Sequence, residues 1–385
     1  MSRGKTAANV PAQAGWDGNE DMHIPDGYLS PSTCAVLYAA SAPVWYVSMR
    51  RVKRRFNTRL VPLLSVFSAL SFVIMMFNVP LPGGTTGHAV GVGVTAIVLG
   101  PWASILAISV AILIQAVFFG DGGITTLGAN CFNMAIAGSL VAFLVYRALA
   151  GRQALTSSRR VVAAAVAGYL AINAAALCAA VELGVQPLFF KDASGAPLYA
   201  PYPLNIAVPA MMIGHLTFAG FAELILSGGA VAYLQRTNPF LLQQTAPGIL
   251  RGGEGPVPAP AQAGWRATRP LWMATALLLV LTPLGILAAG TAWGEWTARD
   301  YSNPAIRQKI AAASGNVAPP IHAPLGLGRL ASMWAAPFPQ YAPPFVRRPA
   351  FGYLLSAMFG TGIIILLSLM AGWLAGRNRW GGTAG

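Results

Sequence analysis

The sequence predicts an all-α integral membrane protein, with seven helical spans in a body and two more in a C-terminal extension. Only 9% of its 385 residues are charged and 55% are hydrophobic, whereas about a quarter of the residues in a soluble domain are charged. The hydrophobic residues also gather in stretches, most of them near the roughly twenty residues that cross a hydrocarbon core about 30 Å thick. The net charge of +14 does not indicate nucleic acid, because the basic residues form short runs between apolar stretches and no zinc-finger or aromatic-interleaved basic motif is present. The expected surroundings are therefore membrane lipid.

Nine apolar stretches account for the predicted spans. They lie at about 32–50, 60–79, 88–99, 101–119, 127–149, 160–184, 205–235, 270–292 and 352–376. The third has only twelve residues, which at 1.5 Å per residue gives about 18 Å of helix. Pro101 separates it from the fourth. We therefore expect either a short crossing buried in protein or a re-entrant piece at this position.

Clusters of Lys and Arg set the predicted orientation. They follow the first and fifth stretches, flank the connection between the seventh and eighth, and end the chain. The positive-inside rule assigns all four clusters, and the C-terminus, to the cytoplasm. The start of the first stretch and the later loops 80–88, 120–126, 185–204 and 293–351 then lie outside. Arg347 and Arg348 argue mildly against the placement of the last loop.

Composition divides the chain into four parts. Residues 1–21 form a polar extension without the apolar run of a signal peptide. Residues 22–236 hold the seven-span domain. Residues 237–268 are rich in Gly, Pro, Ala and Gln, which is typical of a linker and is placed in the cytoplasm here. Residues 269–385 form a two-span tail with an extracytoplasmic loop.

Two histidines on the same predicted outer side are the leading candidates for chemistry. His88 lies in "PLPGGTTGHAVG", where irregular backbone at membrane depth must be buried or line a cavity; a metal ligand and a plain loop residue both remain open. If the chain begins at Met22, its α-amine, the backbone nitrogen of His23 and the His23 imidazole can chelate one ion, with His88 as a fourth nitrogen. Binding would release protons, so affinity should rise with pH. With residues 1–21 attached there is no amine, and this arrangement fails.

Four motifs in series resemble the membrane substrate-binding subunit of energy-coupling-factor cobalt/nickel importers, the CbiM/NikM family. They are "MHIPDGYLS", "NVPLPGGTTGH", "VLGPWAS" and "FGDGGITTLGANCFNMAIAG". The resemblance covers 22–236 and implies ATP-driven uptake of Ni²⁺ or Co²⁺ as transported substrate, with no catalysis by this chain. It implies a multi-pass protein of the cell (inner) membrane whose metal site faces outside. The implied partners are a transmembrane coupling subunit and cytoplasmic ATPase subunits, and no Walker motif is present here.

The same resemblance implies the ligand set. Mature members of the family begin at Met-His, and matching residue by residue gives Met22, His23 and His88 as metal ligands. The tail resembles the small two-span subunit that accompanies such proteins, and "TPLGILAAGTAWGEW" is similar to fused members. Because the tail adds no matched ligand, we expect it to be dispensable for metal binding but not for delivery. Residues 1–21 depart from the family pattern, so we expect translation to start at Met22 or the extension to be removed.

Four further polar residues are predicted to orient the ligands from a second layer. They are Asp26, Asp121, Asn130 and Asn133. Asp26 and Asp121 could equally cap turns or helices. Ionisable groups in or near membrane spans are energetically costly and therefore suggest a function. Three such residues are His215, Glu182 and Glu223. Their roles stay open between inter-helix bonding and contact with a partner subunit.

Several alternatives stay open at this point. His322 is either a plain loop residue or an external metal collector. A stand-alone proton-coupled carrier, with Glu182, Glu223 and His215 relaying protons, is the alternative function; a membrane enzyme fits less well, because no nucleophile–base pair is evident. The residues do not choose between nickel and cobalt.

Overall fold

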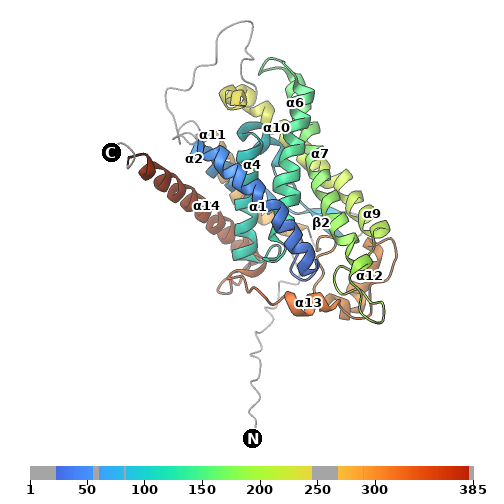
Figure 1. Cartoon of the computed structure of the whole chain (residues 1–385). Coiled ribbons are helices and arrows are strands. Elements are labelled where there is room, and N and C mark those ends of the chain that lie inside the picture. The colour runs from blue at the N-terminus through green and yellow to red at the C-terminus, as the bar shows by residue number, and fades with distance from the viewer. Residues whose placement is uncertain (1–22, 55–59, 82–83, 245–267, 289, 381–385) are drawn as a thin grey trace.

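The computed structural model describes residues 23–54, 60–81, 84–244, 268–288 and 290–380, with side chains as far as residue 373. Within these ranges the chain is a bundle of helices, and the C-terminal elements lie against the N-terminal ones (Figure 1). The helices of the body are α1 (Pro31–Arg54), α2 (Leu60–Met75), α3 (Val92–Leu99), α4 (Pro101–Ile114), α5 (Leu127–Asn130), α6 (Ser139–Ala150), α7 (Ser158–Gly184), α8 (Gln186–Phe189), α9 (Leu204–Gly214) and α10 (Gly220–Thr237). Those of the tail are α11 (Arg269–Leu281), α12 (Pro304–Ala313), α13 (Leu325–Leu330) and α14 (Pro349–Trp380).

Wider and tighter helical turns continue several of these helices. Three π-helical segments occur in the body: η1 (Gln115–Phe119) extends α4, η2 (Cys131–Gly138) joins α5 to α6, and η3 (His215–Ala219) joins α9 to α10. Short 3₁₀ segments are η4 (Pro239–Gln244), η6 (Thr282–Leu287), η7 (Asp300–Ser302) and η8 (Pro339–Tyr341). Because π-turns leave the regular hydrogen-bond ladder and are frequent at functional sites, η2 and η3 point to the part of the bundle that needs the closest inspection.

The predominantly helical membrane architecture is confirmed. Each of the nine apolar stretches contains a helix. Among the described residues, six helical stretches are long and apolar enough to cross a membrane: 101–119, 127–150, 158–189, 204–237, 269–287 and 349–373. The division into seven and two crossings stays a prediction, because α1 ends in basic residues, α2 has 16 residues and α3 has 8.

Helix α3 is the short element that the third stretch predicted. Eight residues make about 12 Å of helix, and all eight are buried. The helix ends at Gly100, whose φ of 76° is a conformation that glycine adopts without a steric penalty. Pro101 then begins α4, where its missing N–H costs nothing. The Gly-Pro pair therefore makes the sharp break between the two helices.

A small β-hairpin interrupts the all-α pattern, and the sequence argument missed it. Strands β1 (Val79–Leu81) and β2 (Thr85–Gly87) pair antiparallel, with Val79 opposite Gly87. The backbone N–H of Thr86 donates to the carbonyl of Thr291 at 3.2 Å, so the tail adds to the hairpin edge. Three-residue strands are too short for the alternating pattern by which strands are recognised. His88 follows β2 directly, so the hairpin positions this candidate ligand.

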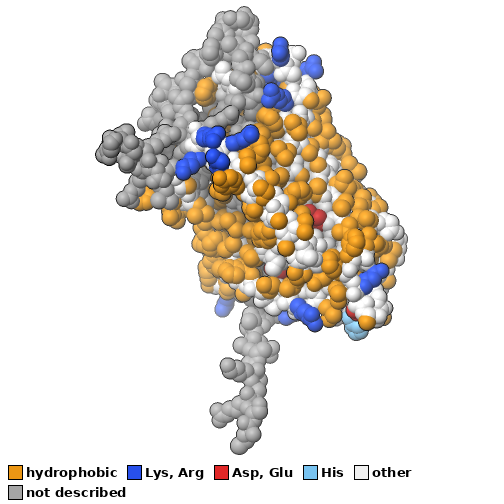
Figure 2. Space-filling view, in the orientation of Figure 1, with side chains coloured by type: hydrophobic (Ala, Val, Ile, Leu, Met, Phe, Trp, Pro, Cys, Tyr) orange, Lys and Arg blue, Asp and Glu red, His pale blue; other side chains and the backbone are white. Residues whose placement is uncertain are grey.

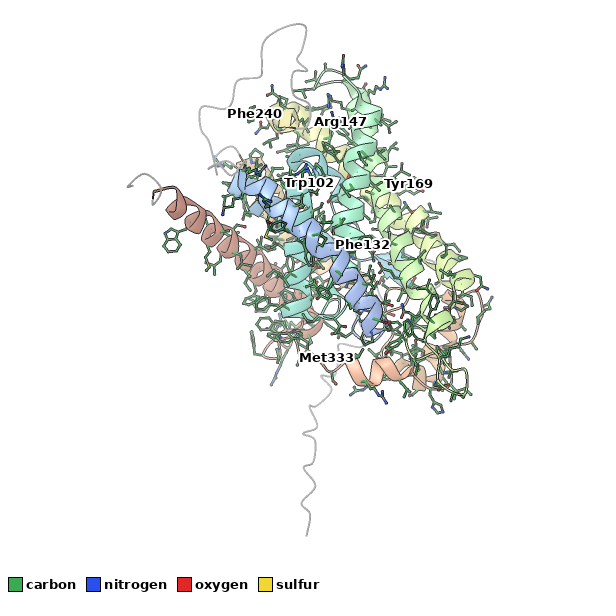
Figure 3. All side chains as sticks on the ribbon, in the orientation of Figure 1. Trp102, Phe132, Arg147, Tyr169, Phe240 and Met333 are labelled. Atoms are coloured by element: carbon green, nitrogen blue, oxygen red, sulfur yellow. The ribbon has the colours of Figure 1, made fainter. Side chains whose placement is uncertain are left out.

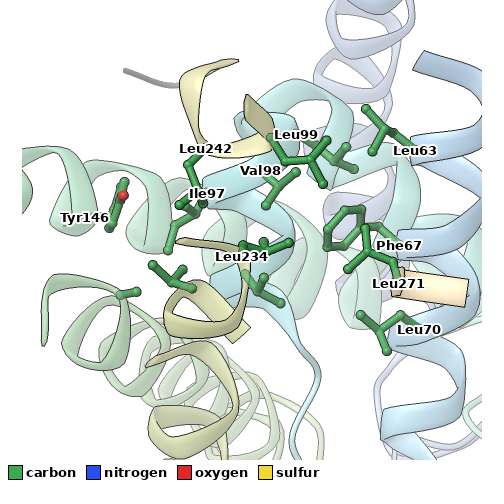
Figure 4. Close-up of a cluster of buried hydrophobic side chains, with 14 of the residues drawn as sticks. Leu63, Phe67, Leu70, Ile97, Val98, Leu99, Tyr146, Leu234, Leu242 and Leu271 are labelled. Carbon is green, nitrogen blue, oxygen red and sulfur yellow. The ribbon is translucent and has the colours of Figure 1, made fainter. Parts of the chain in front are cut away.

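An apolar cluster surrounds α3 and includes a residue of the tail (Figure 4). Ile97 and Val98 of α3 lie among Phe67 of α2 and Leu234 of α10, with Leu271 of α11 on the same cluster. The tail helix α14 packs against α2 as well. Body and tail therefore share one interior.

The flanks of the molecule are apolar. Figure 2 shows hydrophobic side chains over the sides of the bundle, with Lys and Arg side chains toward its two ends. Large exposed hydrophobic residues include Leu216, Phe218, Phe221 and Ile225 on η3 and α10. An apolar belt between two polar ends is what a hydrocarbon core requires, and it supports the membrane location.

The tail also covers one end of the bundle, beside the start of α1, where α12 and α13 lie (Figure 1). The Tyr28 hydroxyl donates to the carbonyl of Trp296 at 2.7 Å. Gly27 has φ 93°, and a Cβ there would meet the carbonyl oxygen of Gly326 at 2.6 Å. The segment that precedes α1 is thus held between body and tail.

Candidate metal centre

His23 and His88 are brought together, as the sequence predicted. Their ring centroids are 5.2 Å apart with an interplanar angle of 62°. Both side chains are nearly inaccessible to solvent, with exposed fractions of 2% and 7%. Met22, the third predicted ligand, lies outside the described residues together with 1–21. The described part of the site is therefore a buried imidazole pair.

Each imidazole has one nitrogen tied to an oxygen. Nδ1 of His23 donates to Oδ1 of Asp121 at 2.8 Å, and Nδ1 of His88 donates to the carbonyl of Ala89 at 2.9 Å. The Nε2 atoms then carry the lone pairs, which is the arrangement that metal-binding histidines show. Nε2 of His23 is buried and has no hydrogen-bond partner among the described residues. A buried acceptor without a partner is costly, and a cation would remove that cost.

The bond to Asp121 bears on the predicted chelate. A chelate ring that includes the backbone nitrogen of His23 can close only through Nδ1, because Nε2 points away from its own backbone. In this structure Nδ1 of His23 is hydrogen-bonded to the carboxylate of Asp121. Coordination through Nε2 needs no rearrangement, whereas the fused chelate requires the ring to turn and leave Asp121.

Burial also keeps His88 neutral. It lies in the loop between β2 and α3, where burial, followed by the neighbouring His23, lowers the pKa of His88 from 6.5 to about 4. A histidine with a lowered pKa is deprotonated above that value. His88 therefore carries a free lone pair throughout the physiological pH range.

Asp121 connects the site to the tail, as Tyr341 of η8 donates to its Oδ2 at 2.6 Å. Gln115 lies beside both and donates from Nε2 to the Tyr341 hydroxyl at 2.9 Å. The Tyr341 ring stacks on Phe119 with centroids 4.7 Å apart. Burial holds the pKa of Tyr341 well above its ordinary value, so the hydroxyl keeps its proton and remains a donor. The chain of contacts runs from Tyr341 through Asp121 to His23.

Asn130 and Asp26 hold the segment around His23. The Asn130 side chain accepts from the N–H of Ile24 at 3.0 Å and donates to its carbonyl at 3.1 Å. Asp26 accepts from the backbone N–H groups of Ile124 and Thr125 at 3.1 and 2.8 Å. Asp26 is thus a turn cap, one of the two roles left open, and through that cap it joins the N-terminal segment to the loop after Asp121.

Two glycines allow this close approach. A Cβ on Gly122, which has φ 81°, would lie 2.8 Å from Cβ of His23. One on Gly123 would collide with the Asp26 carboxylate. The Asp-Gly-Gly run therefore makes room for the segment that carries His23.

Asn133 and Glu182 bond to each other, with Nδ2 of Asn133 donating to Oε2 of Glu182 at 2.9 Å. Among the described residues Asn133 makes no hydrogen bond to either imidazole, but it lines the same cavity. For Glu182 this contact is a hydrogen bond between two helical segments, η2 and α7, which is one of the two roles that the sequence left open.

Glu223 is a residue whose function the sequence left open and whose place is clear in the structure. Its buried carboxylate accepts from the backbone N–H groups of Val90, Gly91 and Gly93 at 2.8, 2.8 and 3.0 Å. A carboxylate at a helix N-terminus satisfies N–H groups that the helix leaves unpaired. Glu223 therefore fixes the start of α3 and the loop before it, in which His88 lies two residues before Val90. The only sequence signal for it is an acidic residue inside an apolar stretch.

A cavity of about 90 Å³ adjoins the imidazole pair and is lined by body and tail. Its walls include His23, His88, Asn133, His215, Trp293 and Glu295. His322, by contrast, is exposed on the tail and does not line it. In the part of the chain that the structure describes, no three His, Cys, Asp or Glu side chains form a ready cluster for a metal. Ligands beyond the imidazole pair would have to come from elsewhere, such as backbone, amine or water.

Comparison with known proteins connects this arrangement to metal transport. Residues 23–241 match the family described as "Cobalt uptake substrate-specific transmembrane region". Residues 268–377 match the PDGLE domain.

Similar proteins match along nearly the whole chain. The chain is 56% identical to the "Fused nickel transport protein NikMN" of Rhodobacter capsulatus over 361 residues, which are 94% of this chain and 100% of that protein. It is 41% identical to the "Probable fused nickel transport protein LarMN" of Lactiplantibacillus plantarum, over 91% and 97% of the two chains. A solved structure of a truncated transition metal transporter matches with a TM-score of 0.52 and 52% identity, over 55% of this chain and 98% of that one.

Proposed function

Because the chain belongs to the family of cobalt uptake substrate-specific transmembrane regions and carries a PDGLE domain, we propose that it is the substrate-binding membrane subunit of an ATP-driven importer. Its cargo is a divalent cation, Ni²⁺ or Co²⁺, bound at the extracytoplasmic side. The chain itself catalyses no reaction; ATP hydrolysis belongs to separate cytoplasmic subunits, joined through a transmembrane coupling subunit.

The observation that carries this proposal is the imidazole pair with both Nδ1 atoms anchored. His23 and His88 lie side by side in a buried site, each with Nδ1 held by an oxygen, and imidazole nitrogen suits Ni²⁺ and Co²⁺ alike. The two relatives that match over 94% and 91% of this chain are named nickel transport proteins, the second as a probable one. We therefore take Ni²⁺ as the principal cargo.

The remaining ligands are proposed to come from the N-terminus. In a chain that begins at Met22, the α-amine and the backbone nitrogen of His23 would complete four nitrogens with the two imidazoles, once the His23 ring turns and its Nδ1 leaves Asp121 for the metal. Before that step Asp121 holds the His23 ring, Asn130 holds the adjoining backbone, and Asp26 caps the adjoining loop. The domain limits, the seven-plus-two span count and the cytoplasmic C-terminus belong to the same proposal.

A stand-alone proton-coupled carrier is less well supported. A relay residue must give up and regain a proton while the ion moves. Glu223 instead binds three backbone N–H groups that fix α3, and protonation would weaken that cap. Its place is that of a structural anchor.

The test is uptake of radioactive Ni²⁺ by cells that lack their own importer. We expect accumulation when the chain is expressed with its coupling and ATPase subunits, and loss of it when the ATP-binding lysine of the ATPases is replaced. Equal accumulation by the chain alone and with the inactive ATPases would favour the carrier instead.

Tyr341→Phe is expected to lower Ni²⁺ affinity about tenfold, at the low end of the effect that partners of metal ligands have. The substitution removes the 2.6 Å hydrogen bond that holds Asp121 against His23. This expectation revises the view that the tail is dispensable for binding, because a tail residue takes part in positioning the site. Isothermal titration of the purified variant against the parent measures the change.

Tyr353→Phe is the matched control for that experiment. It also removes a buried tail hydroxyl, but one that donates to the carbonyl of Met76 at 2.9 Å. We expect parental affinity from the control. Parental affinity in Tyr341→Phe as well would restore the view that the tail contributes nothing to binding.

A further inference from the structure

The cavity beside the imidazole pair extends to a third histidine. His215, at the start of η3, lines the same cavity as His23 and His88. The hairpin that carries His88 lies against η3: a Cβ on Gly87 would be 3.7 Å from Cβ of Ala219. Three of the four histidines of the chain therefore line one cavity.

His215 is prepared for metal binding in the same way as the other two. Its Nδ1 donates to the carbonyl of Met211, one turn earlier, at 2.9 Å. Nε2 then carries the lone pair. A histidine whose only role was to donate a hydrogen bond to a carbonyl of its own helix would not need to line a cavity next to two other imidazoles.

The helices around this part of the cavity are locally distorted. His215 lies in the π-helical segment η3, and Asn133 and Met134, which line the same cavity, lie in the π-helical segment η2. Figure 3 shows Phe132 of η2 between Met333 at one end of the molecule and Arg147 at the other. π-segments persist where a function requires them, and here two of them meet one cavity inside the bundle.

Further donors line the same cavity as His215. Met134 and Met211 are among them, and their thioether sulfurs are soft donors. Oδ1 of Asn133 is buried and has no hydrogen-bond partner among the described residues. One imidazole with weak neutral donors holds a cation more loosely than a four-nitrogen site.

We propose that His215 forms a second position for the transported divalent cation, reached from the His23–His88 site through the cavity that they share. This rests on the proposed function and deepens it. The position at His215 is weaker than the His23–His88 site, so an ion moves from a tight site to one that holds it more loosely. A site that holds only tightly would release its cargo slowly.

The experiment is titration of detergent-purified full-length chain with Ni²⁺ alone, for His88→Ala, His88→Ala/His215→Ala and His88→Ala/His322→Ala. Removing His88 exposes the weaker position. We expect the added His215→Ala to reduce the remaining affinity by a further tenfold or so, the scale at which single groups act at metal sites. The added His322→Ala should change nothing, because His322 is exposed outside the cavity.

Equal affinity of His88→Ala and His88→Ala/His215→Ala would overturn the second position at His215. A second substitution, His215→Gln, keeps the size and polarity of the side chain should the alanine variant not fold, and it is expected to show the same loss. Failure of the proposed function looks different: the parent itself would then bind no Ni²⁺. In the otherwise unchanged chain, His215→Ala should keep the tight binding and slow uptake; unchanged uptake also contradicts the proposal.

Discussion

His88→Ala is expected to weaken Ni²⁺ binding at least 100-fold or so, because loss of a ligand should exceed the 10–100-fold effects of ligand partners. His88 is the imidazole that faces His23, with Nδ1 anchored on the carbonyl of Ala89. No other described His, Cys, Asp or Glu forms a ready cluster with them. Isothermal titration of variant and parent at one pH measures the difference.

His322→Ala serves as the control, since this exposed tail histidine does not line the cavity. It should bind as the parent does. Far-ultraviolet circular dichroism would check that both variants keep their helices. If His88→Ala keeps full affinity in a folded protein, His88 has no place among the ligands.

A chain that keeps residues 1–21 is expected to bind Ni²⁺ far more weakly than one that begins at Met22. In the longer chain a peptide nitrogen takes the place of the α-amine. Extra residues would also enter a crowded place, because His23 is 2% exposed and its Cβ lies against Gly122. Titration of both chains, with their N-termini identified by mass spectrometry, gives the comparison.

Dependence on pH adds a second signature to that comparison. His88, with a pKa of about 4, is already neutral near pH 6, so it adds no further pH dependence above that. Deprotonation of the amine and of the backbone nitrogen does, so the affinity of the chain that begins at Met22 should rise between pH 6 and pH 8. Equal affinities for the two chains, with the extension intact, would refute the terminal-amine ligand and leave imidazole ligands only.

The helices and the outer imidazole pair were predictable for physical reasons. The length of an apolar stretch of sequence indicates whether it forms a helix that lipid or a protein core surrounds. Each of the predicted stretches contains a helix. The Gly100-Pro101 break follows from backbone chemistry alone. His23 and His88 were expected on one side because basic residues set the orientation, and their rings do meet.

The contacts that hold the site were harder to predict, because they join distant parts of the chain. Tyr341 and Asp121 are 220 positions apart, and nothing in the composition of a loop tells which tyrosine reaches a buried carboxylate. Glu223 was visible as a costly acidic residue, but its partners are backbone N–H groups that only the fold brings near. The three-residue strands of the hairpin are too short to leave a periodic pattern.

X-ray absorption at the nickel edge, on the full-length chain loaded with one equivalent of Ni²⁺, tests the account most directly. It predicts a shell of nitrogen donors with the multiple-scattering signal of two imidazoles, reduced to one in His88→Ala. A shell dominated by oxygen or sulfur, or an imidazole signal that His88→Ala leaves unchanged, would contradict a metal site built on His23 and His88.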